Sequence, residues 1–192
     1  MEALKDAIRR WGKGIGTGIV KVDLFLNHRI DTALMTAMGQ EIAAHFAAAS
    51  PNLVMTVEAS GIALAITTAQ ALGNIPVVFT KKHAPSTQQG NVYTQNVRSF
   101  TKNVDYQMRC SAECLEPGAR VLIVDDFLAE GEAIRGMLSL IRQAGATAIG
   151  AGIAIEKAFQ KGGRALREEG LDVLSLAAIR EIRDGDILFL EG

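Results

Sequence analysis

Apolar residues recur along the first half of the chain with the two periods that helices and buried strands show. A helix is predicted after Asp31, whose side chain can cap its first turn, and Pro51 ends it. Short apolar runs at 53–57 and 76–80 predict strands, and a helical pattern at 62–72 separates them. Strands that alternate with helices in this way predict a parallel sheet with right-handed crossovers. The apolar stripe of the helix after Asp31 repeats every four residues and consists of Leu34, Met38, Ile42 and Phe46.

The second half of the chain continues this alternation. A buried strand is predicted at 121–124, and the helix that follows it ends at Gly145. The apolar stripe of that helix consists of Ile134, Met137, Leu138 and Ile141. The remaining elements expected from the pattern are helices at 1–14 and 164–169 and extended segments at 19–26, 148–155, 171–176 and 187–190. We therefore predict one α/β domain over residues 1–192, with a mostly parallel twisted sheet flanked by helices.

Residues 81–102 interrupt the pattern. They are rich in Lys, Ser, Thr, Gln, Asn and Tyr and contain almost no aliphatic side chains. Since a segment this long without a core-facing pattern is either a lid or a mobile loop, we expect a lid over about 81–104. Tyr93, Ser99 and Lys102 are its candidate contacts with a ligand.

The composition is that of a globular protein with a large core, 48% hydrophobic and 21% charged. A net charge of -1 offers no broad basic surface, which argues against nucleic acid or an anionic membrane as a partner. No apolar stretch reaches the roughly 20 residues that span a bilayer, and the charged start of the chain is unlike a signal peptide, so a cytoplasmic location is expected. Cys110 and Cys114 have no second pair or nearby histidine, which favours two reduced thiols over a metal site.

The segment that is most informative about chemistry runs from Val121 to Ile134. Its apolar strand leads to two adjacent carboxylates, Asp125 and Asp126, and a loop containing Gly131 then enters a helix. Ligands bind at the carboxyl ends of parallel strands, and a helix N-terminus offers free amides to an anion. The arrangement suits a phosphate on the loop, with the carboxylates directed at vicinal ribose hydroxyls and a hydrated Mg²⁺. The alternative is that the two aspartates only cap a helix on a solvated loop.

Other catalytic motifs do not occur in the sequence. The glycines at 12, 14, 16 and 18 fail the GxGxxG fingerprint in every register, and they follow a predicted helix rather than a strand. Ser60 lacks a GxSxG elbow, and the three histidines have no HExxH spacing. Neither a dinucleotide site, an acyl-enzyme nor zinc hydrolysis is therefore predicted.

The informative segment resembles the signature of the type I phosphoribosyltransferases, and the resemblance extends over most of the chain. It implies the type I fold, with a small hood from about 1–30 and the C-terminal segment over the base site and with a flexible lid. The similarity is to the members that act on purines. The stretches that carry it are KVD and FLNH within 21–28, SGIA at 60–63, SFTK at 99–102, DDFLA at 125–129 and IEK at 155–157.

The same resemblance implies a role for each stretch in binding the donor, 5-phosphoribosyl 1-diphosphate, or the base. Asp125 and Asp126 would engage the ribose hydroxyls, with Lys81 and Lys82 supporting catalysis. Mg²⁺ would arrive with the donor, and the same two aspartates are its only candidate protein ligands. The expected 5-phosphate site consists of Ala129, Glu130, Gly131, Glu132 and Ala133, and the expected diphosphate loop of Glu58, Ala59, Ser60 and Gly61. The expected base site consists of Val20, Asn27 and Lys157.

The implied reaction joins the phosphoribosyl group to N9 of an oxopurine, with xanthine preferred, and releases diphosphate; the family also implies a homodimer. A lysine such as Lys157 can donate to an exocyclic oxygen of the base. Glu130 and Glu132 stand in a loop where many relatives have threonines, so backbone amides would have to hold the phosphate. Ala129 stands where hypoxanthine-guanine members have an aspartate. A guanine- or hypoxanthine-preferring enzyme and a non-catalytic regulator that senses the donor stay open as alternatives.

Overall fold

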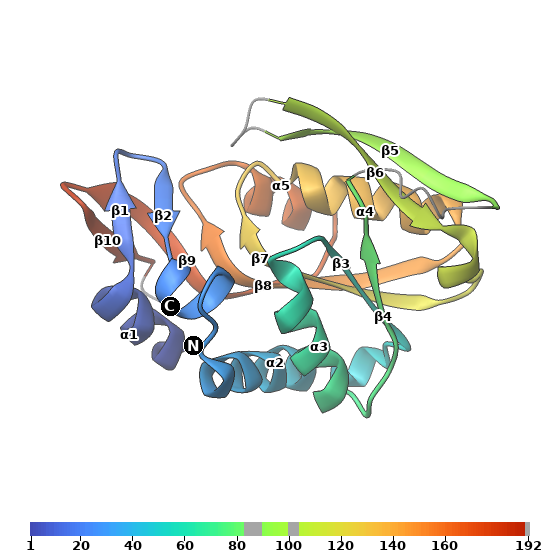
Figure 1. Ribbon diagram of the computed structural model, residues 1–192, viewed down its shortest axis with the longest axis horizontal. Coiled ribbons are helices and arrows are strands. Elements are labelled where there is room, and N and C mark those ends of the chain that lie inside the picture. Colours follow the sequence, from blue (N-terminus) through green and yellow to red (C-terminus); the bar gives the residue numbers. More distant parts are fainter. Residues whose placement is uncertain (83–89, 100–103, 191–192) are drawn as a thin grey trace.

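A mostly parallel sheet runs through the centre of the fold, as predicted. The computed structural model describes residues 1–82, 90–99 and 104–190. The central sheet contains β3 (Leu53–Val57), β4 (Val77–Thr80), β7 (Arg120–Leu128), β8 (Thr147–Lys157), β9 (Val173–Arg183) and β10 (Asp186–Phe189). The strand order is β10-β9-β8-β7-β3-β4, and every neighbouring pair is parallel except β9 and β10 (Figure 1). The carboxyl ends of β3, β7 and β8 therefore meet at one edge of the sheet.

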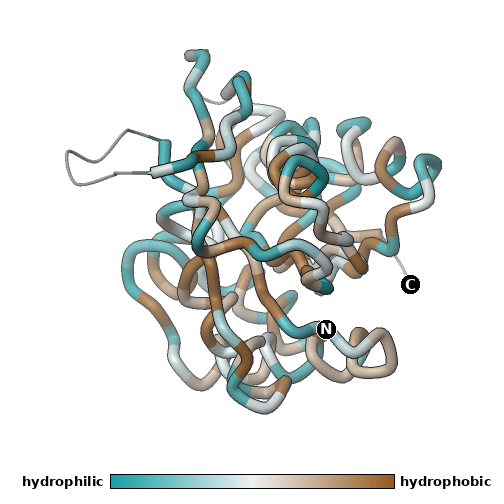
Figure 2. Tube along the Cα trace, turned by 90° about the vertical axis from the view of Figure 1, so that its right-hand side faces the viewer, coloured by the Kyte–Doolittle hydropathy of each residue, from teal (hydrophilic) through white to brown (hydrophobic). Residues whose placement is uncertain are grey.

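Helices cover both faces of the sheet (Figure 1). On one face lie α2 (Thr32–Phe46) and α3 (Gly61–Ala71), and on the other lie α4 (Glu132–Gln143) and α5 (Gly162–Glu168). The apolar run of β7 is buried on both sides for this reason: Leu122 and Val124 pack with the α2–α3 face, and Val121 and Ile123 with the α4 face. Figure 2 shows hydrophobic stretches running through the interior and hydrophilic ones at the outer turns.

The predicted cap and stripe of α2 are confirmed. The side chain of Asp31 accepts hydrogen bonds from the backbone amides of Ala33 and Leu34, at 3.1 and 3.0 Å, and so satisfies two of the free donors at the start of the helix. The stripe faces the core, although Leu34 is only half-buried; its fully buried members are Met38, Ile42 and Phe46. A short 3₁₀ turn, Ala47–Ala49, follows the helix.

The lid expected over 81–104 stays a prediction, but the described residues in the second half of that segment form strands. β5 (Val92–Ser99) and β6 (Val104–Ser111) form an antiparallel hairpin that packs on α4, and a 3₁₀ turn, Ala112–Cys114, follows. Val97 and Met108 are buried against Gly136 of α4, where an added Cβ would lie 2.7 Å from Val97 Cγ2. The sequence pattern missed the hairpin because its apolar residues are sparse and are interspersed with polar ones. The lid candidate Lys102 lies outside the described residues, and Tyr93 is half-buried against the core.

The N-terminal segment lies against the last two strands, where a hood was expected. It consists of α1 (Glu2–Trp11), β1 (Lys13–Ile15), β2 (Ile19–Lys21) and a π-helical turn, η1 (Asp23–Asn27). The N-terminal amino group donates to the carbonyl of Leu176 at 2.6 Å, and the amide of Gly14 donates to the carbonyl of Gly185 at 3.2 Å. The extended segment predicted at 19–26 ends early, because Phe25 and Leu26 turn into the core in a helical conformation.

None of the helices in the described part of the chain combines the length and apolar composition that a bilayer crossing needs.

The end of the chain also differs from the sequence prediction in one respect. The strand expected at 171–176 continues to Arg183 and turns at Gly185 into the antiparallel β10. Gly185 has a φ of +92°, a backbone conformation that favours glycine in such a tight turn.

Candidate active site

A cavity of about 360 Å³ opens at the carboxyl ends of the central strands. Its wall combines β3, β7 and β8 with the β5–β6 hairpin and with β2 of the N-terminal segment. It brings together most of the predicted site residues. These are Val20, Glu58, Ser60, Lys82, Asp125, Asp126, Ala129, Glu130, Gly131, Glu132, Ala133 and Lys157. The predicted residues that do not line it are Asn27, Ala59, Gly61 and Lys81.

The two aspartates lie inside β7 rather than in a loop after it. The strand continues to Leu128 because it keeps pairing with β8 as far as Glu156. Asp125 is 4% and Asp126 8% exposed, and the amide of Asp126 donates to Asp125 Oδ1 at 2.9 Å. A helix-capping pair on a solvated loop does not fit this placement. The strand instead presents two buried carboxylates to the cavity.

Burial raises the pKa of Asp125 well above its ordinary value, and the neighbouring charge of Asp126 raises it further. The amide of Asp126 and the ammonium of Lys82 act in the opposite direction but do not compensate. Hydroxyl donors or a cation that entered the cavity would act against this shift and favour the ionised carboxylate. Such a perturbed acid at the floor of a cleft is typical of a functional site.

The start of α3 passes very close to this carboxyl. A Cβ added at Gly61 would lie 2.2 Å from Thr56 Oγ1 and 2.9 Å from Asp125 Oδ1, both inside normal contact distance. Glycine is therefore required at the first position of the helix, although alanine has the higher helix propensity. Gly61 thus acts from behind Asp125 rather than from the cavity wall.

Replacing Gly61 with alanine is expected to lower both stability and turnover. The clash should cost about 1–3 kcal/mol, more than the helix propensity that alanine gains, and should displace the Asp125 carboxylate. Thermal denaturation and steady-state kinetics measure the two effects. Adding Thr56→Ala removes the nearest clashing atom and should restore part of the lost stability. A Gly61→Ala protein as stable and active as the wild type would contradict this geometry.

The residues predicted to bind the 5-phosphate lie in the turn between β7 and α4 and in the first turn of that helix. Gly131 adopts a φ of +87°, which permits the sharp entry into α4, and the first amides of that helix lack intrahelical partners. Glu130 and Glu132 also line the cavity, so two carboxylates stand beside this amide-rich turn. Lys161 Nζ lies 3.8 Å from a Glu130 carboxylate oxygen, an exposed pair that neutralises little. The turn can hold an anion chiefly through its backbone.

The predicted diphosphate loop follows β3. The carboxylate of Glu58 accepts a hydrogen bond of 2.6 Å from the amide of Lys82, which ties this loop to the end of β4. The Glu58–Ala59 peptide bond is cis. Lys82 lines the cavity, with its Nζ 5.6 Å from the ring centroid of Tyr106. Lys81 instead pairs through its backbone with Arg109 of β6, so the two predicted lysines differ in position.

The far end of the cavity suits a flat ring with an oxygen at its edge. Val20 and Phe127 supply apolar walls, and Lys157 Nζ lies 5.7 Å from the Phe127 ring centroid. The Lys157 ammonium donates to the carbonyl of Gly18 at 2.7 Å, and burial lowers its pKa. Asn27 is exposed at the end of η1 and does not line the cavity, so its predicted place in the base site is not supported.

Sequence reasoning missed the contribution of the β5–β6 hairpin to the site. Val97, Arg98 and Tyr106 from this hairpin line the cavity. Tyr106 is half-buried, and burial together with the nearby Asp125 raises the pKa of its hydroxyl. The signal available in the sequence was the alternation of Tyr106, Met108 and Cys110, which is typical of a half-buried strand.

The residues present fit a magnesium ion only in part. In the part of the chain that the structure describes, no three His, Cys, Asp or Glu side chains come together as a metal site. Asp125 and Asp126 supply two carboxylates at the cavity floor. Since Mg²⁺ needs only one or two carboxylates when substrate oxygens complete its shell, this pair is compatible with an ion that binds together with a phosphorylated substrate.

Solved structures similar to this chain show the same fold. A crystal structure of adenine phosphoribosyltransferase from Rhodothermus marinus superposes with a TM-score of 0.73, at 18% identity, over 93% of this chain and all (100%) of the other. APRTase from Giardia lamblia, complexed with 9-deazaadenine, gives a TM-score of 0.77 at 21% identity, over 91% of this chain and 97% of the other. The type I fold predicted from the sequence is confirmed.

Comparison of the sequence with known proteins identifies the family and more similar relatives. Residues 23–173 match the phosphoribosyl transferase domain. The chain is 50% identical over 190 residues to the xanthine phosphoribosyltransferase of Moorella thermoacetica, covering 99% of this chain and 96% of that protein. It is 51% identical over 189 residues to the xanthine phosphoribosyltransferase of Heliobacterium modesticaldum, covering 98% and 100%. With a domain match over most of its length and full-length relatives this similar, the chain belongs to the phosphoribosyl transferase family.

Proposed function

We propose that this protein transfers the phosphoribosyl group of 5-phosphoribosyl 1-diphosphate to N9 of xanthine, forming xanthosine 5'-monophosphate and diphosphate. The observation that carries the proposal is the cavity in which Asp125 and Asp126 share one wall with the amide-lined turn around Gly131. A ribose and its 5-phosphate can be bound there together. The names of the full-length relatives supply the base.

The cavity supports a reaction driven by positioning and electrostatics. The turn after β7 holds the 5-phosphate, and the carboxylates of Asp125 and Asp126 accept hydrogen bonds from the ribose hydroxyls. Positive charge that develops on the sugar as its bond to diphosphate breaks is stabilised by the same two carboxylates. The loop from Glu58 to Ser60 and the ammonium of Lys82 receive the departing diphosphate. Mg²⁺, when bound with the donor, would neutralise part of the charge of that leaving group.

The base end of the cavity supports an oxopurine. The Lys157 ammonium now donates to the carbonyl of Gly18. It can donate in the same way to an exocyclic oxygen of the base, because that oxygen is an acceptor of the same kind. Phe127 and Val20 can contact the two faces or the edge of the ring. Ala129 brings no carboxylate to the base, in contrast to the aspartate of hypoxanthine-guanine members. A role for Asn27 would require η1 to rearrange.

A competition assay with three bases tests the proposal. Purified protein is supplied with the donor, Mg²⁺ and xanthine, guanine or hypoxanthine, and diphosphate release is followed for each. Turnover with a preference for xanthine is expected. A preference for guanine or hypoxanthine would overturn the base assignment. Donor binding without any turnover would instead identify a regulator that senses the donor, the alternative outside the enzyme class.

Replacing Glu132 with glutamine is expected to lower KM for the donor, by roughly two- to fivefold. The Glu132 carboxylate lines the cavity beside the phosphate turn and repels a phosphate there. The variant should lose a few tenths of a kcal/mol of stability, because an acidic residue in the first turn of α4 favours the helix dipole. Kinetics at low and high salt measure the effect, which salt should weaken. Glu168→Gln, on the exposed end of α5, is the matched control.

Magnesium dependence and a homodimer remain predictions from the resemblance, and a cytoplasmic location remains a prediction from the sequence. Removal of Mg²⁺ with a chelator is expected to abolish turnover while leaving the fold intact, since no protein-only metal site occurs in the described residues. Circular dichroism and the diphosphate assay measure these two outcomes. Sedimentation equilibrium would test the dimer.

A further inference from the structure

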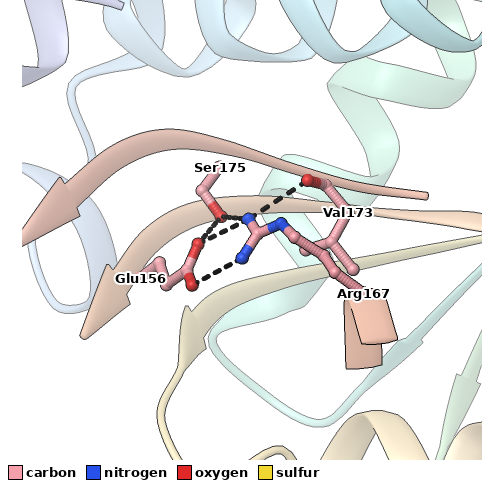
Figure 3. A network of polar contacts seen from close by, with 4 residues as sticks. All are labelled: Glu156, Arg167, Val173 and Ser175. Carbon is pink, nitrogen blue, oxygen red and sulfur yellow. Dashed lines mark hydrogen bonds and ion pairs between the residues drawn. The ribbon is translucent and has the colours of Figure 1, made fainter. Parts of the chain in front are cut away.

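An ion pair between a buried glutamate and a partly exposed arginine joins β8 to α5, outside the residues assigned above. Arg167 of α5 donates from both terminal nitrogens to the carboxylate of Glu156, at 2.8 and 2.7 Å, in a two-pronged arrangement (Figure 3). Glu156 is 4% exposed, and Ser175 of β9 donates to the same carboxylate. Arg167 also donates to the carbonyl of Val173 at 3.2 Å. The pair therefore fixes α5 to three points on two strands.

The charge of Glu156 is maintained in spite of its burial. Burial raises the pKa of this carboxyl, but hydrogen bonds from Arg167 and Ser175 together with the charge of Arg167 outweigh it, so the pKa is lowered overall. Well-packed apolar residues could hold a helix to a sheet equally well, so an ion pair that buries one of its two charges is weak support for a purely stabilising role. Its two-pronged geometry instead fixes the position and rotation of α5.

The first residues of α5 fill the space between this ion pair and the phosphate turn. A Cβ at Gly163 would lie 1.9 Å from Glu156 Oε1. A Cβ at Gly162 would lie 2.3 Å from the carbonyl oxygen of Ala129 and 2.5 Å from the amide nitrogen of Gly131. The Gly162 amide donates to that same Ala129 carbonyl at 3.1 Å. Backbone thus meets backbone here, so any shift of α5 is passed directly to the turn.

A second ion pair restrains the other end of the helix. Arg135 of α4 donates to the carboxylate of Glu169, the residue that follows α5, at 2.7 Å. α4 begins directly after the phosphate turn, so α5 contacts both the turn and the helix that supplies its amides. The turn has no side-chain donors of its own for a phosphate, which makes the exact placement of its backbone amides decisive.

We propose that Arg167 and Glu156 are positioning residues for donor binding: through the Gly162–Gly163 start of α5 they hold the backbone of residues 129–131 in the conformation that binds the 5-phosphate. This rests on the proposed function, since it takes the turn after β7 to be the 5-phosphate site. Neither residue lines the cavity.

The test compares three variants with the wild type by two measurements, the affinity for ribose 5-phosphate from calorimetry and the KM for donor and base from kinetics. Arg167→Met keeps the length of the side chain and removes the pair; it is expected to weaken ribose 5-phosphate binding and raise donor KM on the order of tenfold, with base KM nearly unchanged. Arg167→Lys retains one charged contact, so its affinity and donor KM should lie between those of the wild type and of Arg167→Met. It replaces Arg167→Met as the test variant if the methionine variant does not fold. Arg164→Met, on the exposed side of the same helix, should match the wild type.

The outcomes separate this inference from the proposed function. A lower melting temperature for Arg167→Met and Arg167→Lys, with donor KM and ribose 5-phosphate affinity unchanged, would show a merely structural pair and overturn the inference. If the wild type binds ribose 5-phosphate but does not turn over xanthine, the proposed function fails, and the affinity series still decides the role of Arg167. If the wild type binds no ribose 5-phosphate, both fail.

Discussion

Asp125→Asn is expected to reduce turnover by at least about a hundredfold while the protein becomes more resistant to unfolding. The loss of activity follows from removing a charge that would stabilise the developing positive charge on the ribose. Asparagine can keep the contact with the Asp126 amide, because its side-chain oxygen replaces Oδ1. The fold should therefore tolerate the change.

The gain in stability follows from the raised pKa of Asp125. A group whose pKa is higher in the folded protein than in the unfolded chain contributes stability below its unfolded pKa and loses that contribution as the pH rises through its folded pKa. Asparagine cannot ionise, so the melting temperature of the variant should exceed that of the wild type at neutral pH. The difference should shrink as the pH falls toward about 4, the ordinary pKa of an aspartate, and should vanish only below it, where the unfolded wild type is protonated as well.

Melting curves between about pH 4 and pH 8 check this prediction together with the diphosphate assay. Asp186→Asn, on exposed β10, is the control and should change neither turnover nor the pH profile of stability. Turnover within twofold of the wild type would show that the Asp125 carboxylate does not act on the ribose. A variant less stable than the wild type at neutral pH would show that the buried charge is compensated in the folded protein.

Lys157→Met is expected to raise KM for xanthine on the order of a hundredfold and to leave ribose 5-phosphate affinity unchanged. The methionine keeps an apolar stem in the cavity wall but removes the ammonium, and a hydrogen bond from a charged donor is worth about 1.5–3 kcal/mol. Lys157 lines the cavity, and its half-buried ammonium donates to one protein carbonyl at 2.7 Å, which leaves two of its three hydrogens for a ligand.

The three-base assay, repeated on the variant, measures the effect. Lys21→Met, an exposed lysine near the same end of the molecule, is the control and should behave as the wild type. Unchanged turnover of xanthine by Lys157→Met would remove Lys157 from the base site. A comparable loss of ribose 5-phosphate affinity would place the effect on the phosphate turn, since Lys157 follows Glu156 on β8.

The β5–β6 hairpin supplies part of the cavity wall that the sequence predicted to be a lid. The polar stretch around residue 90 was expected to be a loop that covers the reactants, yet residues 92–99 form a strand whose Val97 is packed on α4. This part of the cavity wall is therefore anchored.

Local pattern alone determined the parallel sheet, the helix caps and the segment that carries the chemistry. Asp31 capped α2 as predicted, and the apolar run before Asp125 became a strand buried on both faces, because periodicity and capping act over a few neighbouring residues. β5 and β6 were missed because their apolar residues are few, and Val97 and Met108 are buried only through packing on Gly136 of α4.

Only the tertiary structure decided which distant residues share the cavity and what their environment does to them. Tyr106 reaches Asp125 from a separate hairpin, while Asn27, adjacent in sequence to buried residues, stays at the surface. The Glu156–Arg167 pair joins a strand to a helix. Its proposed effect on the phosphate turn depends on Gly162 and Gly163, which lie between the pair and that turn. Burial and backbone contact are properties of the packed chain, so no spacing of residues along the sequence reveals them.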